Sequence, residues 1–162
     1  MKRISILIFA FTLPVITLFS CSQTSDNRLS TQIDSIKKQL KAAYVPGTGE
    51  IMNGIIQPHH YKLWLAGHQQ NWTLAEYERH QLLGGFKRIE KYHKGTPEAA
   101  AAPMIYPEIT AIEIAISQKD EKAFKNHFAL MTNVCNTCHQ ATKYEFNVIT
   151  VPTAPDFGNQ HF

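Results

Sequence analysis

The sequence predicts an all-α protein: an antiparallel four-helix bundle with an extra N-terminal helix and an extended C-terminal tail. Apolar residues recur at every third or fourth position over most of the region from residue 29 to residue 144, a spacing that lets a helix bury one face. Short breaks rich in glycine and proline divide this region, and short links are typical of antiparallel neighbours in a bundle. From residue 147 onward, β-branched residues and two prolines favour extended structure.

The chain opens with the features of a secretory signal. Met1-Lys2-Arg3 is basic, and residues 4–19 are almost uninterrupted apolar sequence. This apolar run is shorter than the roughly 20 residues that a membrane-spanning helix needs, and Pro14 interrupts it. We therefore expect residues 1–20 to be a signal peptide that is removed on export.

The end of this signal, Leu18-Phe19-Ser20-Cys21, resembles the bacterial lipobox, in which a small residue precedes a cysteine that becomes lipidated and N-terminal. The resemblance implies that Cys21 carries a lipid anchor in the cell envelope, in the periplasm or at the outer membrane. Residues 21–28 are then a polar tether. The alternative is cleavage to a soluble periplasmic protein.

The charge of the chain argues against a nucleic-acid partner. The formal charge of +3 falls to +1 when Lys2 and Arg3 leave with the signal, and no basic block remains. About 140 residues are left, which is enough for one domain that buries roughly two-thirds of its surface.

The extra helix is expected at about 29–44, before the break Pro46-Gly47-Thr48-Gly49. Its apolar residues are Leu29, Ile33, Ile36 and Leu40. The first bundle helix is expected at about 50–66, kinked or divided by Pro58. Its apolar stripe is Met52, Ile56, His59, Leu63 and Ala66.

The second bundle helix is expected at about 72–93, with Asn71 as its N-cap. After a connector at 98–107, a short helix carries Ile109, Ile112 and Ile116. The last helix is expected at about 120–144. Its stripe is Phe124, Phe128, Met131, Cys135, Cys138 and Thr142. The helical domain is therefore expected at 29–146 and the tail at 147–162.

The stretch Cys135-Asn136-Thr137-Cys138-His139 matches the c-type haem attachment signature. Two intervening residues in a helical turn bring both sulfurs to one edge of a porphyrin, where they can reach its two vinyl groups. The histidine that follows can supply an imidazole nitrogen to the iron. We predict one covalent haem c, anchored at Cys135 and Cys138, with His139 as the proximal ligand.

A Cys-x-x-Cys pair can also be a redox disulfide or half of a zinc site. The thioredoxin-like case has alternating strands and helices around the pair, which this sequence does not predict. A zinc site usually has a second Cys-x-x-Cys or a His-x-x-x-His partner, and the chain has neither. With Cys21 assigned to lipid, the three cysteines leave none for a disulfide.

A helical bundle with Cys-x-x-Cys-His near the end of its last helix resembles the cytochrome c-prime family. The resemblance covers roughly residues 49–144. That family often has an aromatic residue three positions after the motif histidine and a basic residue four after. Here Thr142 departs from the pattern and Lys143 keeps it, so Lys143 is a candidate partner of a haem propionate.

The predicted helix heights place Met52 within a turn of the haem, on the opposite side from His139. The resemblance agrees, because six-coordinate relatives of cytochrome c-prime take a methionine from the start of their first bundle helix. His59 is expected roughly 15 Å along the helix from the level of His139, which is too far for its side chain to reach the iron. His93 is a further candidate ligand. Met52 as a plain core residue remains the alternative.

Four more side chains are expected in the haem pocket: Phe86, Ile89, Tyr92 and Met131. The histidines His59, His60 and His68 are close in sequence and could suggest a second metal site. We expect instead that His59 lies hydrogen-bonded on the core seam and that His60 faces outward.

The favoured function is a carrier of single electrons between redox proteins of the cell envelope, and not an enzyme. Iron held by both His139 and Met52 has no open position. A haem protein that binds a small gas such as NO or CO is the alternative. A peroxidase-like enzyme would use a distal base with Arg79 or Arg88 nearby. Relatives of cytochrome c-prime often form dimers, which makes a homodimer a further expectation.

Overall fold

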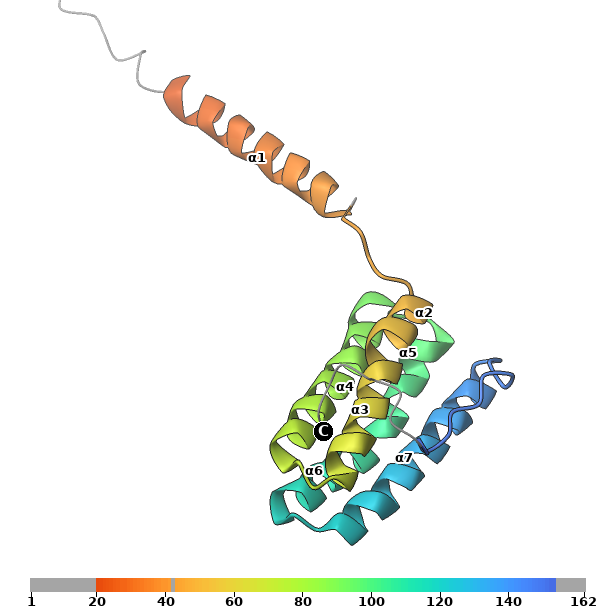
Figure 1. Ribbon diagram of the computed structural model, residues 1–162. Helices are drawn as coiled ribbons and strands as arrows, with labels where there is room; N and C mark the ends of the chain where they lie inside the picture. The colour runs from red at the N-terminus through yellow and green to blue at the C-terminus, as the bar shows by residue number, and fades with distance from the viewer. Residues whose placement is uncertain (1–19, 42, 154–162) are drawn as a thin grey trace, which may run out of the picture. The chain divides into compact units, whose positions relative to one another are not determined.

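The computed structural model describes residues 20–41 and 43–153, and these residues form helices, turns and extended segments without a β-strand (Figure 1). The prediction of an all-α protein is confirmed for this part of the chain. Most of the expected signal peptide, the side chain of Cys21 and the tail beyond residue 153 lie outside the described residues. The chain divides into two units, 1–44 and 45–162.

The described part of the first unit is one helix, α1 (Ser20–Lys41), with a short segment after it. It begins earlier than expected, so residues 21–28, assigned to a tether, are helical. The apolar residues of the predicted stripe are all exposed in this unit: Leu29, Ile33, Ile36 and Leu40.

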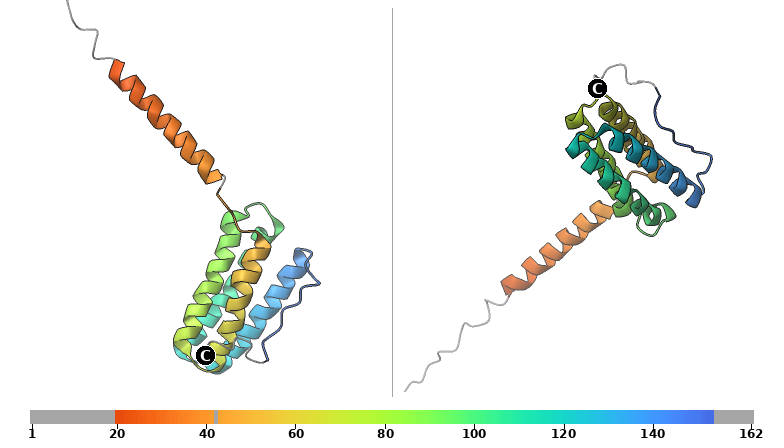
Figure 2. Two further views of the ribbon diagram at one scale, coloured as in Figure 1. Left: turned by 45° about the horizontal axis from the view of Figure 1, so that its top comes forward. Right: turned by 90° about the horizontal axis from the view of Figure 1, so that it is seen from below.

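Up to residue 153, where its described part ends, the second unit has four long helices and four short ones. The long helices are α3 (Gln57–His68), α4 (Trp72–Tyr92), α6 (Tyr106–Gln118) and α7 (Glu121–Ala141). The short ones are α2 (Thr48–Ile51), the π-helix η1 (Met52–Ile56), α5 (Pro97–Ala101) and the 3-10 helix η2 (Ala102–Ile105). Helices α3 and α6 each pack against both α4 and α7, which closes a ring around one core (Figures 1 and 2).

Side-chain caps define where the helices begin. Asn71 accepts a hydrogen bond from the backbone N–H of Leu74 at the start of α4, which confirms the predicted cap. Asp120 does the same for α7 through Ala123. The connections between α3 and α4 and between α6 and α7 are only a few residues long, so each pair is antiparallel.

The π-helix η1 shifts the register of the helix that follows. The backbone N–H of Gln57 bonds to the carbonyl of Met52, five residues back. Ile51 is therefore buried in place of Met52. Beyond the π-turn, between the buried residues Ile56 and Leu63, His60 is buried and His59 only partly so. The expectation that His60 faces outward is wrong. We attribute the wide turn to Pro58, which has no N–H and whose ring crowds the carbonyl four residues earlier.

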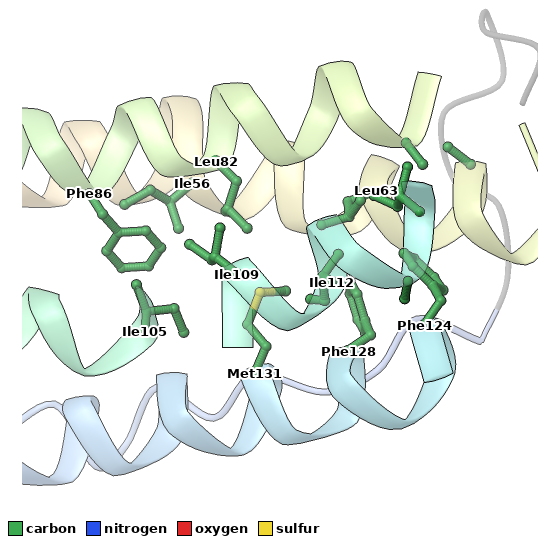
Figure 3. Close-up of a cluster of buried hydrophobic side chains, with 14 of the residues drawn as sticks. Ile56, Leu63, Leu82, Phe86, Ile105, Ile109, Ile112, Phe124, Phe128 and Met131 are labelled. Carbon is green, nitrogen blue, oxygen red and sulfur yellow. The ribbon is translucent and has the colours of Figure 1, made fainter. Parts of the chain in front are cut away.

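The core of the second unit is a continuous cluster of aliphatic and aromatic side chains (Figure 3). Ile109, Ile112 and Ile116 of α6 are buried, as their spacing predicts. The run Pro97–Gln118 has the length and composition of a membrane span, but these isoleucines pack in the core. At one end, Gly67 lets α3 approach α7: a Cβ there would lie 2.1 Å from the ring of Phe124.

Helix α7 ends directly after the cysteine motif. The backbone N–H of Tyr144 bonds to the carbonyl of His139 at 2.7 Å, and Lys143 has a φ of 65°. This is a left-handed helix end of the Schellman type. It reverses the chain, and the segment that follows runs back beside α7 (Figure 2).

Candidate haem site

Helix α7 brings the motif residues to one pocket. Cys135, Cys138 and His139 all line a pocket with a volume of about 500 Å³. Cys135 and Cys138 are one helical turn apart and both are free thiols. A residue spacing of three and four along a helix keeps such side chains on one face.

The other walls come from three separate parts of the chain. The segment around η1 and the start of α3 contributes Met52, Asn53, Ile56, Gln57 and His60. Helix α4 contributes Phe86, and the chain after α7 contributes Asn147 and Ile149. A second pocket of about 700 Å³ shares Met52, Cys138 and His139 and continues toward Glu98 and Phe146. Both volumes include space that is open to solvent.

The imidazole of His139 is oriented by a backbone carbonyl. Its Nδ1 lies 2.6 Å from the carbonyl oxygen of Asn147. Because a carbonyl only accepts, Nδ1 carries the proton in this bond, and the neutral ring then keeps its lone pair on Nε2. Metal-bound histidines commonly have this arrangement, with one nitrogen on the metal and the other on a carbonyl.

Burial keeps both thiols protonated. It raises the pKa of Cys135 to about 12, with the neighbouring Cys138 as a second cause. Burial also raises the pKa of Cys138, and the carboxylate of Glu98 adds to the effect. A reactive redox cysteine has a lowered pKa instead. The pair therefore lacks the electrostatics of a thioredoxin-like disulfide site.

A zinc site also finds no support in the donor set. Among the described residues, no group of three or more His, Cys, Asp or Glu side chains is placed to hold a metal ion. This applies both to the cysteine motif and to the cluster His59, His60 and His68. A haem differs because its porphyrin supplies four nitrogens, so that the chain needs to add only the axial ligands.

Met52 lies at the first position of η1, half-buried, and lines both pockets together with His139. A buried hydrogen bond gives the register: Nε2 of His60 lies 3.0 Å from the hydroxyl of Thr132 on α7. Met52 is eight residues before His60, and Gln140 is eight after Thr132. In an antiparallel pair these positions are level, so Met52 and His139 share a height. π-Helical turns often occur at functional sites.

Two other predicted candidates have different partners. Nε2 of His93, at the end of α4, donates to the carbonyl of Pro46 at 2.9 Å. Arg79 forms ion pairs with Glu76 and Glu113, and Arg88 is exposed. No arginine of the described residues lines either pocket.

Of the additional pocket residues predicted, Phe86 lines the pocket. Ile89 and Met131 are fully buried in the core. Tyr92 is exposed, as is Lys143 at the turn after α7. The motif thus meets two of its predicted neighbours, Met52 and Phe86.

The two adjacent histidines make different contacts. Nδ1 of His59 lies 2.5 Å from the carboxylate of Glu78, a residue that is only 2% exposed. His60 packs on the ring of Phe128, and its burial lowers its pKa to about 4. Because the hydroxyl of Thr132 already donates to the carbonyl of Phe128, Nε2 of His60 donates to that hydroxyl. His60 is therefore neutral at pH 7, and it lines the motif pocket.

Several residues at the site carried no signal in the sequence. Asn136, inside the motif, forms two hydrogen bonds with the backbone of Ile149, at 2.8 Å and 2.9 Å. The polar side chains Asn53 and Gln57 lie beside Met52 in the pocket wall. Asparagine and glutamine at these positions look like ordinary surface residues until the fold brings the distant segment 147–153 against α7.

The donor set fits a haem c: two free thiols one turn apart, an imidazole with its free lone pair on Nε2 and a thioether at the same height, around one pocket. In comparisons with protein-family models, with curated proteins and with solved structures, no match to this chain was found.

Proposed function

We propose that this protein binds one covalent haem c and carries single electrons. The observation that carries the proposal is that Cys135, Cys138, His139 and Met52 line the same pocket, although Met52 is more than 80 residues away in the sequence. Haem held there supplies an iron that changes between two oxidation states. The chain holds the group, supplies its axial ligands and limits the access of water.

In this proposal each side chain has a defined task. Cys135 and Cys138 form the thioethers, and His139 binds iron through Nε2 while Asn147 holds Nδ1. Met52 is the sixth ligand, a thioether that favours ferrous iron and raises the reduction potential. Ile56 and Phe86 provide apolar walls at the pocket. With His139 and Met52 both holding the iron, no position would be left for a substrate, and the group would serve to exchange electrons.

We further propose that α3, α4, α6 and α7 are an antiparallel four-helix bundle of the cytochrome c-prime type. The closed ring of helix contacts and the position of the motif in the last helix support this. The secretory signal and the lipobox support attachment to a membrane of the cell envelope through Cys21. Redox proteins of that compartment are then the partners, and a homodimer is a further possibility that follows from the resemblance.

One observation favours a second function, the binding of a small gas. Asn53 and Gln57 lie in the pocket wall next to Met52. If Met52 left the iron, these side-chain amides would be the candidate donors of a hydrogen bond to a diatomic ligand in this pocket. The wide turn of η1 gives the segment around Met52 a backbone unlike a regular helix.

Optical spectra of the purified holoprotein separate the two functions. They are recorded oxidised and reduced, with and without carbon monoxide, for the wild type, Met52→Ala and the matched control Met104→Ala. Met104 is a half-exposed methionine on η2. It lines a small pocket beside Cys135 and Cys138, but neither of the two pockets that Met52 shares with His139.

Electron transfer predicts a low-spin spectrum with a methionine-to-iron band in the wild type and in Met104→Ala. This spectrum does not respond to carbon monoxide, and Met52→Ala loses the band. A high-spin wild type that binds carbon monoxide, with no change in Met52→Ala, contradicts the carrier and supports gas binding.

A further inference from the structure

We propose that the segment 147–151 is a clamp that fixes the imidazole of His139, and that Asn136 is the positioning residue that holds this clamp in place. The inference rests on the proposed haem function and extends it. It assigns a role to Asn136, one of the two residues between the cysteines, where haem attachment does not require a particular amino acid. It also assigns a role to the segment after α7, which a four-helix bundle does not need.

The end of α7 aims the segment at the histidine. Lys143 takes a left-handed conformation, with φ of 65°, and Tyr144 donates to the carbonyl of His139. A second turn follows, in which the N–H of Asn147 donates to the carbonyl of Tyr144 at 2.9 Å. Two consecutive turns therefore send the chain back along the helix that it has just left. The carbonyl of Asn147 then meets Nδ1 of His139.

Two residues beyond the contact between Asn147 and His139, Asn136 of α7 holds the segment by hydrogen bonds to Ile149. Its Nδ2 donates to the carbonyl of Ile149, and its Oδ1 accepts from the N–H of Ile149. This pair copies the two-bond pairing of neighbouring strands. Only an amide side chain offers a donor and an acceptor side by side in this way. Alanine offers neither group.

Two further contacts keep the segment in place. Val151 packs against the core cluster of the unit. Ile149 and Asn147 form part of the wall of the motif pocket. The clamp is thus fixed at three successive points: the carbonyl of Asn147 on His139, the backbone of Ile149 on Asn136 and the side chain of Val151 on the core.

The clamp has a chemical consequence for the metal. A carbonyl that accepts a hydrogen bond from the Nδ1–H makes Nε2 a stronger electron donor and fixes the rotation of the ring. A stronger donor stabilises ferric iron, so the clamp lowers the reduction potential. Loss of the clamp raises it.

The test uses the holoprotein with Asn136→Ala, with Ile149→Pro and with both substitutions. Ile149→Pro removes the N–H that Asn136 accepts from and keeps the carbonyl, so it breaks one bond of the same pair from the other side. Thr137→Ala is the matched control. Thr137 is the other residue between the two cysteines, and its hydroxyl bonds to the carbonyl of Asn133 within α7.

Two quantities are measured: the midpoint potential by redox titration, and the hydrogen exchange of the backbone amides in 147–151. Covalent haem is quantified first in every variant. Asn136→Ala is expected to shift the ratio of oxidised to reduced protein at a fixed potential by about tenfold toward the reduced form, which is about 59 mV for one electron. Amides of the segment exchange faster. Ile149→Pro shifts the potential in the same direction by a smaller amount, and the double variant adds little to Asn136→Ala because that variant has already lost both bonds.

A wild type without covalent haem overturns the proposed function, and with it this inference. If the wild type and the variants carry haem and Asn136→Ala keeps the potential and the exchange rates of Thr137→Ala, the clamp alone is wrong. If Asn136→Ala yields no holoprotein, Ile149→Pro decides by the same two measurements.

Discussion

The two ends of the second unit are built from the same helices but differ in what fills the space between them. At one end the rings of Trp64, Trp72, Phe124 and Phe128 contact one another at centroid distances of 5.0–6.3 Å. At the other end the same faces of α3 and α7 border a pocket lined by Met52 and both motif cysteines. We call these the packed end and the pocket end.

Helix α7 carries one continuous stripe through both ends, so the difference comes from its neighbours. At the packed end, Gly67 brings α3 close and Phe124 fills the space. At the pocket end, the π-turn before Pro58 rotates the helix, and the returning segment 147–153 forms a wall. The packed end can supply most of the stability. The pocket end is then free to keep polar groups and thiols beside a cavity.

The largest predicted effect tests the boundary between the two ends, where His60 lies. Its pKa is about 4 in the folded protein and about 6.5 in the unfolded chain, so the unfolded state binds the proton first as pH falls. Stability is full above pH 6.5 and decreases as the pH drops toward 4. The loss from this group is about 3 kcal/mol.

Urea unfolding of the wild type and of His60→Gln, measured between pH 7 and pH 4, checks this. Glutamine keeps a donor for Thr132 but does not titrate. The free energy of unfolding of the variant relative to the wild type should rise as pH falls. Parallel curves for the two proteins would show that burial does not lower the pKa of His60.

The next effect compares one glycine from each end. A Cβ at Gly67 would meet the ring of Phe124 at 2.1–2.6 Å, whereas a Cβ at Gly54 would meet nothing within 4 Å. Gly67→Ala should lower the free energy of unfolding by about 2 kcal/mol. Gly54→Ala should leave it unchanged or raise it by up to about 1 kcal/mol, because alanine is the better helix former. Equal losses in denaturant unfolding would remove the distinction between the ends.

The smallest effect concerns the turn that leads into the clamp. Lys143 has a φ of 65°, a left-handed conformation that costs any residue with a Cβ about 1 kcal/mol relative to glycine. Lys143→Gly should therefore be more stable than Lys143→Ala by about 1 kcal/mol in thermal or urea unfolding. Alanine is the control, since it removes the same charge and keeps the strain. A glycine variant no more stable than the alanine variant would contradict the left-handed turn.

The packed end and the motif helix follow well from the sequence, for a physical reason. Phe124, Phe128 and Met131 recur at helical spacing and are fully buried, and Asn71 caps α4 as predicted. Such signals are local: a helix buries one face whatever its partner, and a cap bonds to a backbone N–H three residues away. The Cys-x-x-Cys-His motif is local in the same sense.

The register of α3 and the contacts of the tail did not follow. After Ile56 a helical spacing of three or four residues fits either histidine, and the predicted stripe assigned His59 to the core where the structure buries His60. Ile89 and Met131 were expected at the pocket and lie in the core instead. Asn136 and Asn147 act through contacts between separated segments, and side-chain spacing contains no information on such contacts.

The most direct test of the central claim is whether haem remains attached after unfolding. The exported protein is denatured, extracted with acidic acetone and assayed as its pyridine haemochrome, alongside the double variant Cys135→Ala/Cys138→Ala. The account predicts one haem per chain that resists extraction in the wild type and none that resists it in the variant. A wild type that yields no haem, or haem that is extracted equally from both proteins, would contradict it.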